Sequence, residues 1–326
     1  MSIRRLNASE LGEIEPLIRD YPYRPYRNYR VYSRRVQTAI LRAEIESALS
    51  ASNGLVFYAE GASPAGLVLR RLQWDSQFFG VPMARIEYLL RTRERDRAGL
   101  DQVLSACAET CRAEGIWHVT VRLDVADTLA IVVLEDHGYR LMDALVTYIQ
   151  RPKDDPPRAV REVGTIRPFR PEDADELLAI TCDSYRGFRG RFHLDPHLPD
   201  ERCDALYLEW ARQCCTGRMA DEVLVSEGAG GELYGFLAFR RREPTSSVGN
   251  VAIYGAGLGA SRRDTPGAYA GLLRAGMSWA YERGGVAEGQ TQNYNFPTVR
   301  VYEAVGGKYV RADYTFHGWF GPARST

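Results

Sequence analysis

The chain has 326 residues, of which 45% are hydrophobic and 26% are charged. These proportions are those of a folded protein rather than a disordered one, and the length suits two domains better than one. The 42 basic and 42 acidic residues leave a formal net charge of zero, which excludes a global field that would gather nucleic acid or an anionic membrane.

The beginning of the chain lacks an apolar leader, and no apolar run approaches the length of a membrane span. The six cysteines are spread thinly, without a Cys-x-x-Cys pair. These features predict a cytoplasmic protein with reduced cysteines and with neither a nucleic-acid nor a membrane partner.

The first half begins with a pattern typical of a short strand and then a helix, over residues 3–18. Residues 21–32 interleave tyrosines with arginines; this pattern can stack on bases, but a neutral protein favours an interfacial loop. Residues 56–71 predict a hairpin, and residues 72–82 an aromatic turn that starts a strand. A helix over 100–115 ending at glycine and a buried strand over 117–123 follow.

Paired prolines beside charged residues at 151–158 cannot continue a helix or a central strand, and they indicate a linker. We therefore expect a first domain over 1–152, a linker over 153–163 and a second domain over 164–326.

The second half repeats the first. A strand and helix at 165–180, a hairpin at 223–241, a helix at 269–284 and a strand at 286–291 follow in the same order. Residues 302–307 align with 134–139 at a separation of 168 residues. The sequence thus predicts an α/β protein in which each half is a mixed, mostly antiparallel sheet flanked by helices. A single large α/β domain is the alternative, but it leaves the repeat unexplained.

The order of elements, ending in the segment from Asn295 through Tyr302 to Gly306, resembles the GNAT superfamily of N-acetyltransferases in a tandem-domain form. The segments at 72–82, 184–196 and 277–284 are similar to those of dTDP-fucosamine acetyltransferase and related sugar-nucleotide N-acetyltransferases. The resemblance covers nearly the whole chain, although its fold serves many acceptors.

The resemblance implies that acetyl-CoA, or another acyl-CoA, lies between the fourth and fifth strands as co-substrate. It makes Tyr302 the catalytic acid that protonates the leaving thiolate, and Asn295 a contact for the donor. The residue that aligns with Tyr302 in the first half is Leu134, which has no proton to give. The second half is therefore expected to be catalytic and the first degenerate. A tyrosine buried only for packing is the alternative for Tyr302.

The donor's phosphates are expected at the start of the helix near residue 268, with seven contacts in order along the chain: Leu258, Gly259, Arg262, Arg263, Thr265, Gly267 and Ala268. This loop departs from the family pattern, because only Gly267 remains of three glycines and Asp264 stands where a basic or neutral residue is usual. Bulk at Tyr269 is expected to hinder close approach of the backbone. The first half has only a charged run at 91–99 at this place.

Arg189, Arg191 and His193 are the expected contacts for the acceptor. The arginines have an alternative role in a surface salt-bridge cluster with Asp195 and Asp200. We expect no metal, because Pro196 separates His193 from His197 and no third ligand stands nearby in the sequence.

The function expected from this pattern is an N-acyltransferase acting on the amine of a small acceptor such as a nucleotide-linked amino sugar. Three alternatives remain: a GNAT enzyme of natural-product metabolism with another donor or acceptor, a peptide N-acetyltransferase, and a non-catalytic relative that binds a nucleotide or a partner. A homodimer is left open.

Overall fold

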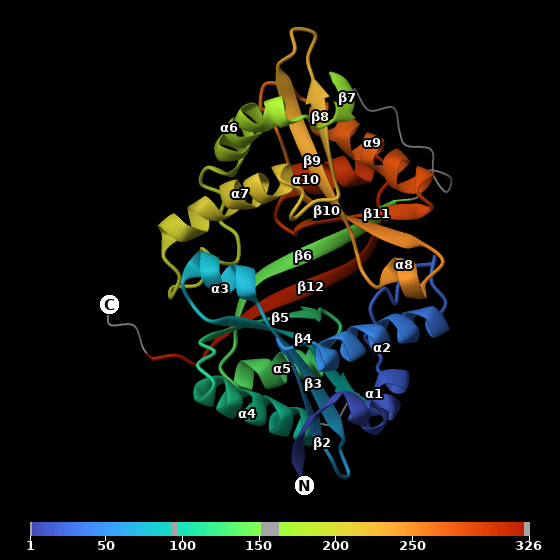
Figure 1. Cartoon of the computed structure of the whole chain (residues 1–326), viewed down its shortest axis with the longest axis vertical. Helices are drawn as coiled ribbons and strands as arrows, with labels where there is room; N and C mark the ends of the chain where they lie inside the picture. Colours follow the sequence, from blue (N-terminus) through green and yellow to red (C-terminus); the bar gives the residue numbers. More distant parts are fainter. Residues whose placement is uncertain (1, 93–96, 151–162, 323–326) are drawn as a thin grey trace. The chain divides into compact units, whose positions relative to one another are not determined.

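The computed structural model describes residues 2–92, 97–150 and 163–322. The chain divides into two compact units, each an α/β sandwich (Figure 1). Unit 1 consists of residues 1–144, 194–197 and 312–326, and unit 2 of residues 145–193 and 198–311. The predicted fold class is therefore confirmed, whereas the linker predicted at 153–163 falls almost wholly outside the described residues.

The sheet of unit 1 has the order β1-β2-β3-β4-β5-β12. Its strands are β1 (Ile3–Leu6), β2 (Gly54–Ala59), β3 (Ala65–Arg71), β4 (Met83–Arg91), β5 (His118–Asp124) and the last part of β12 (Lys308–Trp319). Its helices are η1 (Ala8–Ile14), α1 (Glu15–Asp20), α2 (Arg34–Ser50), α3 (Gln73–Phe79), α4 (Arg97–Ala113) and α5 (Thr128–Asp136). Only β4 and β5 pair in parallel within it; the other pairs described are antiparallel.

Unit 2 repeats this arrangement in the order β6-β11-β10-β9-β8-β7. Its strands are the last part of β6 (Arg140–Gln150), β7 (Thr165–Pro168), β8 (Glu222–Glu227), β9 (Leu233–Arg241), β10 (Ala252–Ser261) and β11 (Gly285–Gln292). Its helices are η2 (Pro171–Asp173), α6 (Ala174–Tyr185), α7 (Asp200–Cys215), α8 (Thr245–Val248), α9 (Ala268–Glu282) and α10 (Phe296–Ala304). Here β10 and β11 form the parallel pair.

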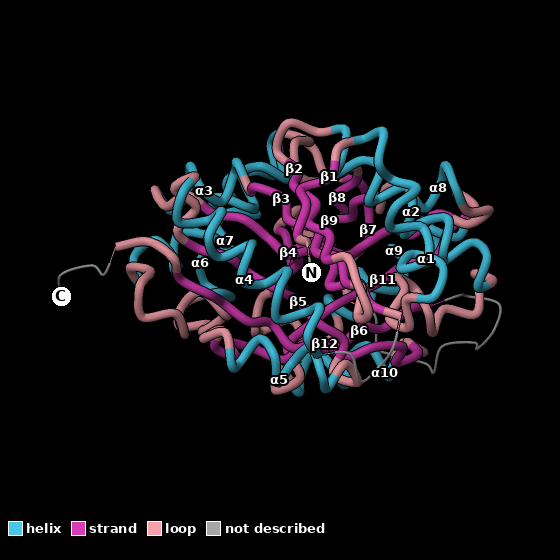
Figure 2. Tube along the Cα trace, turned by 90° about the horizontal axis from the view of Figure 1, so that it is seen from below, coloured by secondary structure: helices cyan, strands magenta, loops and turns pink. Residues whose placement is uncertain are grey.

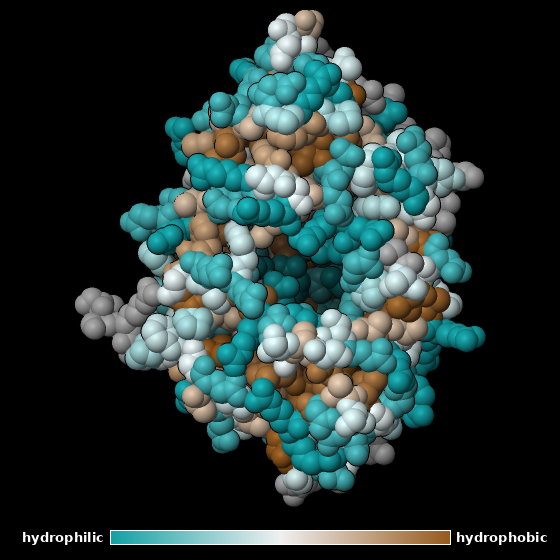
Figure 3. All heavy atoms as spheres, viewed as in Figure 1, coloured by the Kyte–Doolittle hydropathy of each residue, from teal (hydrophilic) through white to brown (hydrophobic). Residues whose placement is uncertain are grey.

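Each sheet is covered by helices on both faces, as the helices and strands of Figure 2 show. In unit 2 the side chains of β9 alternate: Leu237 and Phe239 pack with α9, whereas Phe236 and Ala238 pack with α6 and α7. In unit 1 the corresponding helices are α4 and α5 on one face and α1 and α2 on the other. The face of the molecule in Figure 3 is accordingly mostly hydrophilic, with hydrophobic side chains in scattered patches.

Two local features differ from the sequence prediction. The aromatic turn expected at 72–82 is a short helix, α3, that ends at Gly80 in the left-handed conformation, and Trp74 stacks on Phe78 within it. The last strand of each half is assigned to the other unit: residues 145–150 of β6 pair with β11, and residues 313–319 of β12 pair with β5.

Candidate functional site

The two parallel strands of unit 2 part at a defined point. They are paired from Ala252 with Gly285 to Ala256 with Gly289, after which β10 continues along β9 and β11 continues along β6. The register of β10 with β9 shifts between Ala256 and Leu258, so that Gly257 is an extra, bulged residue. The bulge turns β10 away from β11 just after their pairing ends. A gap therefore opens between the two strands.

A pocket lies where the strands part, lined by residues from six elements, including Ala256 of β10. Its walls include Tyr148 of β6, Phe239 of β9, Glu288 and Gly289 of β11 and Tyr302 of α10. Leu273 and Met277 of α9 also line it. This pocket is small and almost wholly apolar, and Glu288, Tyr148 and Tyr302 are among the residues that line it.

Tyr302 is buried, and its hydroxyl points at the backbone of β11. A Cβ atom added to Gly289 would lie 2.2 Å from the Tyr302 hydroxyl oxygen, so only glycine leaves room for this side chain. The ring stacks on Tyr148 with centroids 5.3 Å apart, and the hydroxyl hydrogen-bonds to that of Tyr269. Burial, strengthened by Tyr269, raises the pKa of Tyr302 well above its ordinary value. Tyr302 therefore holds its proton at neutral pH, as a proton donor must.

The ring of Tyr269 lies against Gly259 of β10, where a Cβ atom added to Gly259 would be 3.1 Å from the ring. Burial raises the pKa of Tyr269 to about 12. The residue thus connects the first turn of α9 to Tyr302, a role that no local pattern in the sequence reveals.

The loop before α9 has one feature of an anion site. Gly267 precedes the helix with a φ of 108°, a conformation that favours glycine, and the first N–H groups of α9 lack intrahelical partners. Arg262, however, donates to Asp264 over 3.3 Å and lies 3.9 Å from Glu176. Its charge is thus partly neutralised, whereas Arg263 is exposed. The hydroxyl of Thr265 donates to the Arg262 carbonyl and braces the turn.

The freed part of β10 is contacted by the end of α6. The Tyr185 hydroxyl donates to the carbonyl of Gly259 over 3.0 Å, and the Ser184 hydroxyl to that of Ser261 over 3.3 Å. Leu258, which precedes Gly259, is buried against the α6 and α7 side of the sheet. At the far end of the gap, Asn295 precedes α10 and its amide donates to Thr291 over 3.0 Å.

The three expected acceptor contacts do not converge on one point. The His193 ring accepts from the backbone of Gly190 over 3.3 Å and meets Asp204 at 3.0 Å. Arg189 donates to the carbonyl of His193 over 3.2 Å, while Arg191 lies over the ring of Phe192. These contacts stabilise the loop between α6 and α7.

Glu288 was missed by the sequence reasoning. It is 4% exposed and lies 3.0 Å from a guanidinium nitrogen of Arg242. A carboxylate between the small residues Ala287 and Gly289 of a buried strand is a signal, because a buried acid persists only with a partner or a function. Its position on the pocket wall places a charge near Tyr302.

Comparison with known proteins sets this geometry in context. No protein-family model matches the chain. A curated relative, the spore coat polysaccharide biosynthesis protein SpsD of Bacillus subtilis (strain 168), is 25% identical over 154 residues, which cover 47% of this chain and 50% of that protein. The match thus spans about half the length of the relative.

Two solved structures match nearly end to end. A GCN5-related N-acetyltransferase from Sphaerobacter thermophilus has a TM-score of 0.61 at 15% identity, covering 100% of this chain and 97% of that one. A tandem GNAT protein from the clavulanic acid biosynthesis pathway has a TM-score of 0.57 at 15% identity, covering 99% of both chains. The chain has the tandem GNAT fold. The resemblance drawn from the motifs is thereby confirmed at the level of the fold.

In the first unit an internal ion pair lies at the corresponding place. The strands β4 and β5 are paired from Met83 with His118 to Ile86 with Val121. Beyond this point the buried Arg91 of β4 forms a bidentate ion pair with Asp127, the cap of α5, which aligns with Asn295 of the second unit. The Tyr23 ring lies over the Arg91 guanidinium at 5.4 Å. An internal ion pair thus occupies the end of the gap.

The tyrosine-rich segment at 21–32 belongs to this closure. The Tyr23 hydroxyl donates to the carbonyl of Ala126 over 2.9 Å, and Arg27 donates to Asp124 over the same distance. Three of its tyrosines, Tyr21, Tyr29 and Tyr32, are buried. These rings therefore serve packing within unit 1. The charged run at 91–99 is only partly described, since residues 93–96 lie outside the described ranges.

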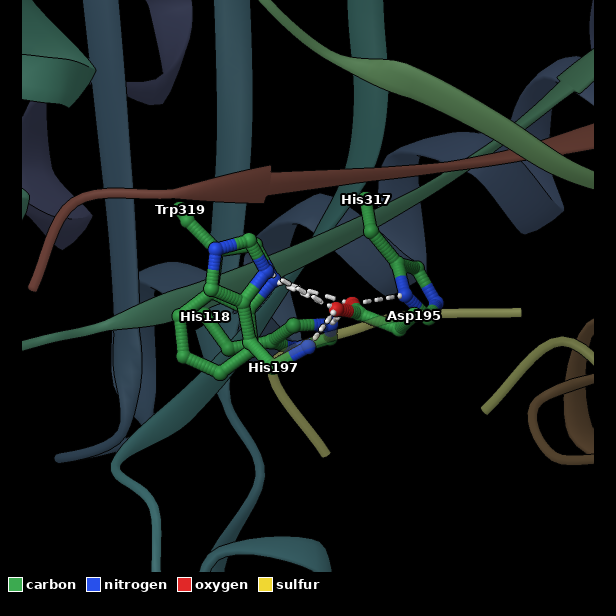
Figure 4. Close-up of polar contacts among 5 residues, drawn as sticks. All are labelled: His118, Asp195, His197, His317 and Trp319. Atoms are coloured by element: carbon green, nitrogen blue, oxygen red, sulfur yellow. Dashed lines mark hydrogen bonds and ion pairs between the residues drawn. The ribbon is translucent and has the colours of Figure 1, made fainter. Parts of the chain in front are cut away.

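A second polar cluster lies in unit 1 around Asp195 (Figure 4). His118 and His317 approach its carboxylate to 3.6 and 2.7 Å, and Trp319 donates to both oxygens over 2.9–3.0 Å. The backbone of His197 also donates to it. The alternative of a surface salt bridge between Asp195 and the arginines is therefore wrong, because the carboxylate is buried.

The donor atoms of His118, Asp195 and His317 lie within 4.8 Å of one another, close enough to suggest metal ligands. The carboxylate oxygens already accept several hydrogen bonds, however, and one donor is the indole of Trp319, which does not bind metals. The cluster is thus best described as a hydrogen-bonded charge network.

Among the described residues, no helix is long and apolar enough to cross a membrane.

Proposed function

We propose that this protein is a GNAT-type acyltransferase whose second unit moves an acetyl or other acyl group from a CoA thioester to the amine of a small molecule. The observation that carries the proposal is the parting of β10 and β11 at Gly257, with the hydroxyl of Tyr302 held against Gly289 at that point. A free strand edge beside a protonated phenol suits an extended donor whose leaving group needs a proton.

The residues around the gap fit such a donor. The edge of β10 at Leu258 and Gly259 would pair with the pantetheine amides, although the donor would meet the hydroxyls of Ser184 and Tyr185 there. The pyrophosphate would lie at the start of α9, near Gly267 and Ala268, with Thr265 and the exposed Arg263 beside it. Asn295 would contact the donor from the start of α10, and Arg262 would contribute less because Asp264 holds it.

The transfer follows from these positions. The amine nitrogen bonds to the thioester carbon, the C–S bond breaks, and Tyr302 gives its proton to the leaving thiolate. A backbone N–H beside the bulge polarises the carbonyl, and Glu288, on the wall of the same pocket, accepts the proton that the amine loses. Tyr302 then regains a proton from solvent.

The acceptor we propose is an amino sugar, carried for example on a nucleotide. Its support is the sequence relation to SpsD, a protein of polysaccharide biosynthesis, together with the motifs at 184–196. Arg189, Arg191 and His193 would bind the acceptor from the loop between α6 and α7. An acceptor or acyl group from natural-product metabolism is the alternative within the same reaction class.

A non-catalytic relative is the second candidate. The loop before α9 favours it, because this loop retains one glycine and holds Arg262 in an ion pair with Asp264. Such a protein would still bind a nucleotide at the gap without acyl transfer.

Native mass spectrometry with acetyl-CoA, longer acyl-CoAs and free CoA, added separately, tests donor binding. The release of free CoA thiol is then followed with a panel of amino sugars and sugar nucleotides. We expect one donor per chain and thiol release that depends on the amine. Binding without transfer to any amine would favour the non-catalytic candidate, and no binding of any CoA species would contradict the proposal.

A further inference from the structure

The last strand of the first half supplies a wall of the pocket in unit 2. Residues 145–150 of β6 pair antiparallel with β11, and in this register Tyr148 stands opposite Gly289. Tyr148, Ile149 and Gln150 all line the pocket. The pocket that contains Tyr302 is therefore built from both halves of the sequence.

Tyr148 contacts Tyr302 through its ring. The two rings are stacked with an interplanar angle of 7° and centroids 5.3 Å apart. The hydroxyl of Tyr148 donates to Glu303, the next residue of α10, over 3.4 Å. Gln150 donates to the carbonyl of Val305 at the end of the same helix. The strand β6 thus contacts α10 through two hydrogen bonds, at Glu303 and Val305, and through the stacked ring of Tyr302.

The first unit provides an internal comparison. In unit 1, β12 pairs with β5 in the same register, and Phe316 stands opposite Val121. Phe316 takes the place of Tyr148, Val121 that of Gly289 and Leu134 that of Tyr302. The two members of each pair are 168 residues apart.

The packing is shared, since Phe316, Val121 and Leu134 belong to one apolar cluster. Unit 2 differs by the hydroxyl of Tyr148, the phenol ring of Tyr302 and the space at Gly289. Packing alone is thus satisfied in unit 1 by a valine, a leucine and a phenylalanine.

We propose that Tyr148 is a positioning residue, which holds the ring of Tyr302 so that its hydroxyl stays in the space left by Gly289. This inference rests on the proposed function of Tyr302 as the proton donor. A stacked ring restricts rotation of its partner, and a proton donor displaced by about 1 Å loses on the order of 100-fold in rate. Without the ring of Tyr148, Tyr302 turns toward the space that the ring had filled.

The test is a double-mutant cycle between Tyr148→Leu and Tyr302→Phe, with turnover and donor KM measured for all four proteins. We expect Tyr148→Leu to lower kcat by roughly 10- to 100-fold with donor KM within about twofold. In the Tyr302→Phe background the same change should have little further effect, because the group it positions is absent. Tyr148→Phe keeps the stacked ring and should retain most of the turnover.

Phe316→Leu in unit 1 is the matched control, since it removes the equivalent ring from the apolar cluster in which Leu134 takes the place of Tyr302. It should lower thermal stability by as much as Tyr148→Leu does and leave kcat unchanged. Equal losses from Tyr148→Leu in both Tyr302 backgrounds, or a similar loss of kcat from Phe316→Leu, would overturn the proposal.

A second readout separates this proposal from the proposed function. A fluorotyrosine placed only at position 302 reports the environment of the ring by ¹⁹F NMR. Tyr148→Leu should shift and broaden its resonance, and Tyr148→Phe should not. Absence of turnover in the unmutated protein would contradict the proposed function, whereas an unchanged resonance in Tyr148→Leu would contradict the role of Tyr148.

Discussion

At the scale of single residues, the two halves differ at the position of Gly289, which is Val121 in the first half. Gly289 lies against the hydroxyl of Tyr302, and Val121 of the first half fills the equivalent space beside Leu134. The residue at this position thus decides whether the sheet has room for a hydroxyl from the helix that follows the strand. Glycine leaves that room, and valine fills it. The difference is a matter of side-chain volume rather than of backbone conformation.

This comparison gives a prediction for Gly289→Val. An added Cβ atom would lie 2.2 Å from the Tyr302 hydroxyl, so the ring must leave its position. We expect kcat to fall by roughly 100-fold or more, as for other displaced catalytic groups, with the fold retained. Val121→Gly is the matched control in unit 1; it should lower the unfolding free energy and leave kcat unchanged. Turnover of Gly289→Val near that of the unmutated protein would contradict the account of this position.

Tyr302→Phe removes the hydroxyl and keeps the ring that stacks on Tyr148. A general acid typically contributes ~10²–10⁴-fold to rate, so steady-state kinetics should show a loss of kcat of that order with the donor Kd unchanged. Because the pKa of Tyr302 is raised, the unmutated enzyme should show no alkaline loss of kcat from this group near pH 10, where an ordinary tyrosine ionises. Unchanged turnover in the variant would remove Tyr302 from the mechanism.

Asp195 gives a prediction about stability. Burial alone would raise its pKa, but hydrogen bonds from His118, His317 and Trp319 outweigh it, and the pKa is lowered. A carboxylate with a lowered folded-state pKa stabilises the fold above the unfolded value near 4 and loses that contribution as pH falls through the folded value. Asp195→Asn should therefore cost about 3 kcal/mol of unfolding free energy at pH 7. Denaturant unfolding should show this difference shrinking below pH 4; a difference that grows there would contradict the assignment.

At the scale of elements, the sequence patterns located most helices and strands but not the exchange of the last strands. The repeat at 168 residues places β6 and β12 equally at the end of each half. Side chains alternate in the same way along both strands, and each strand pairs with the same kind of strand. The local sequence therefore does not distinguish pairing within a half from pairing across halves. The role of Tyr148 depends on such pairing, and no local pattern could give it.

The loop before α9 is the element at which we propose that the phosphates of the donor bind. Gly267 has a φ of 108°, so any other residue there is strained, and an acidic one also repels phosphate. Calorimetric titration should show Gly267→Asp weakening the donor Kd at least tenfold more than Gly267→Ala, which adds the strain without the charge. Equal effects of the two variants would mean that phosphate is not bound at this turn.

At the scale of the whole molecule, the repeat and the tandem GNAT fold could be predicted because they rest on many residues spread over the chain. The charge network of His118, Asp195 and His317 could not, since its members are far apart in sequence and share no spacing rule. The division of labour between the halves was predicted from Tyr302 and Leu134 and from Gly267 against the charged run at 91–99, and it stays a prediction. In the first unit, Arg91 of that run forms a buried ion pair with Asp127.

The central claim is that the acyl donor binds the second unit, at the gap between β10 and β11. A crystal structure of the protein with an unreactive acyl-CoA analogue tests it most directly. The account predicts density for the pantetheine arm along Leu258 and Gly259, with the thioester sulfur within hydrogen-bond reach of the Tyr302 hydroxyl. Density at the ends of β4 and β5 in the first unit, near residue 91, with the second unit empty, would contradict it.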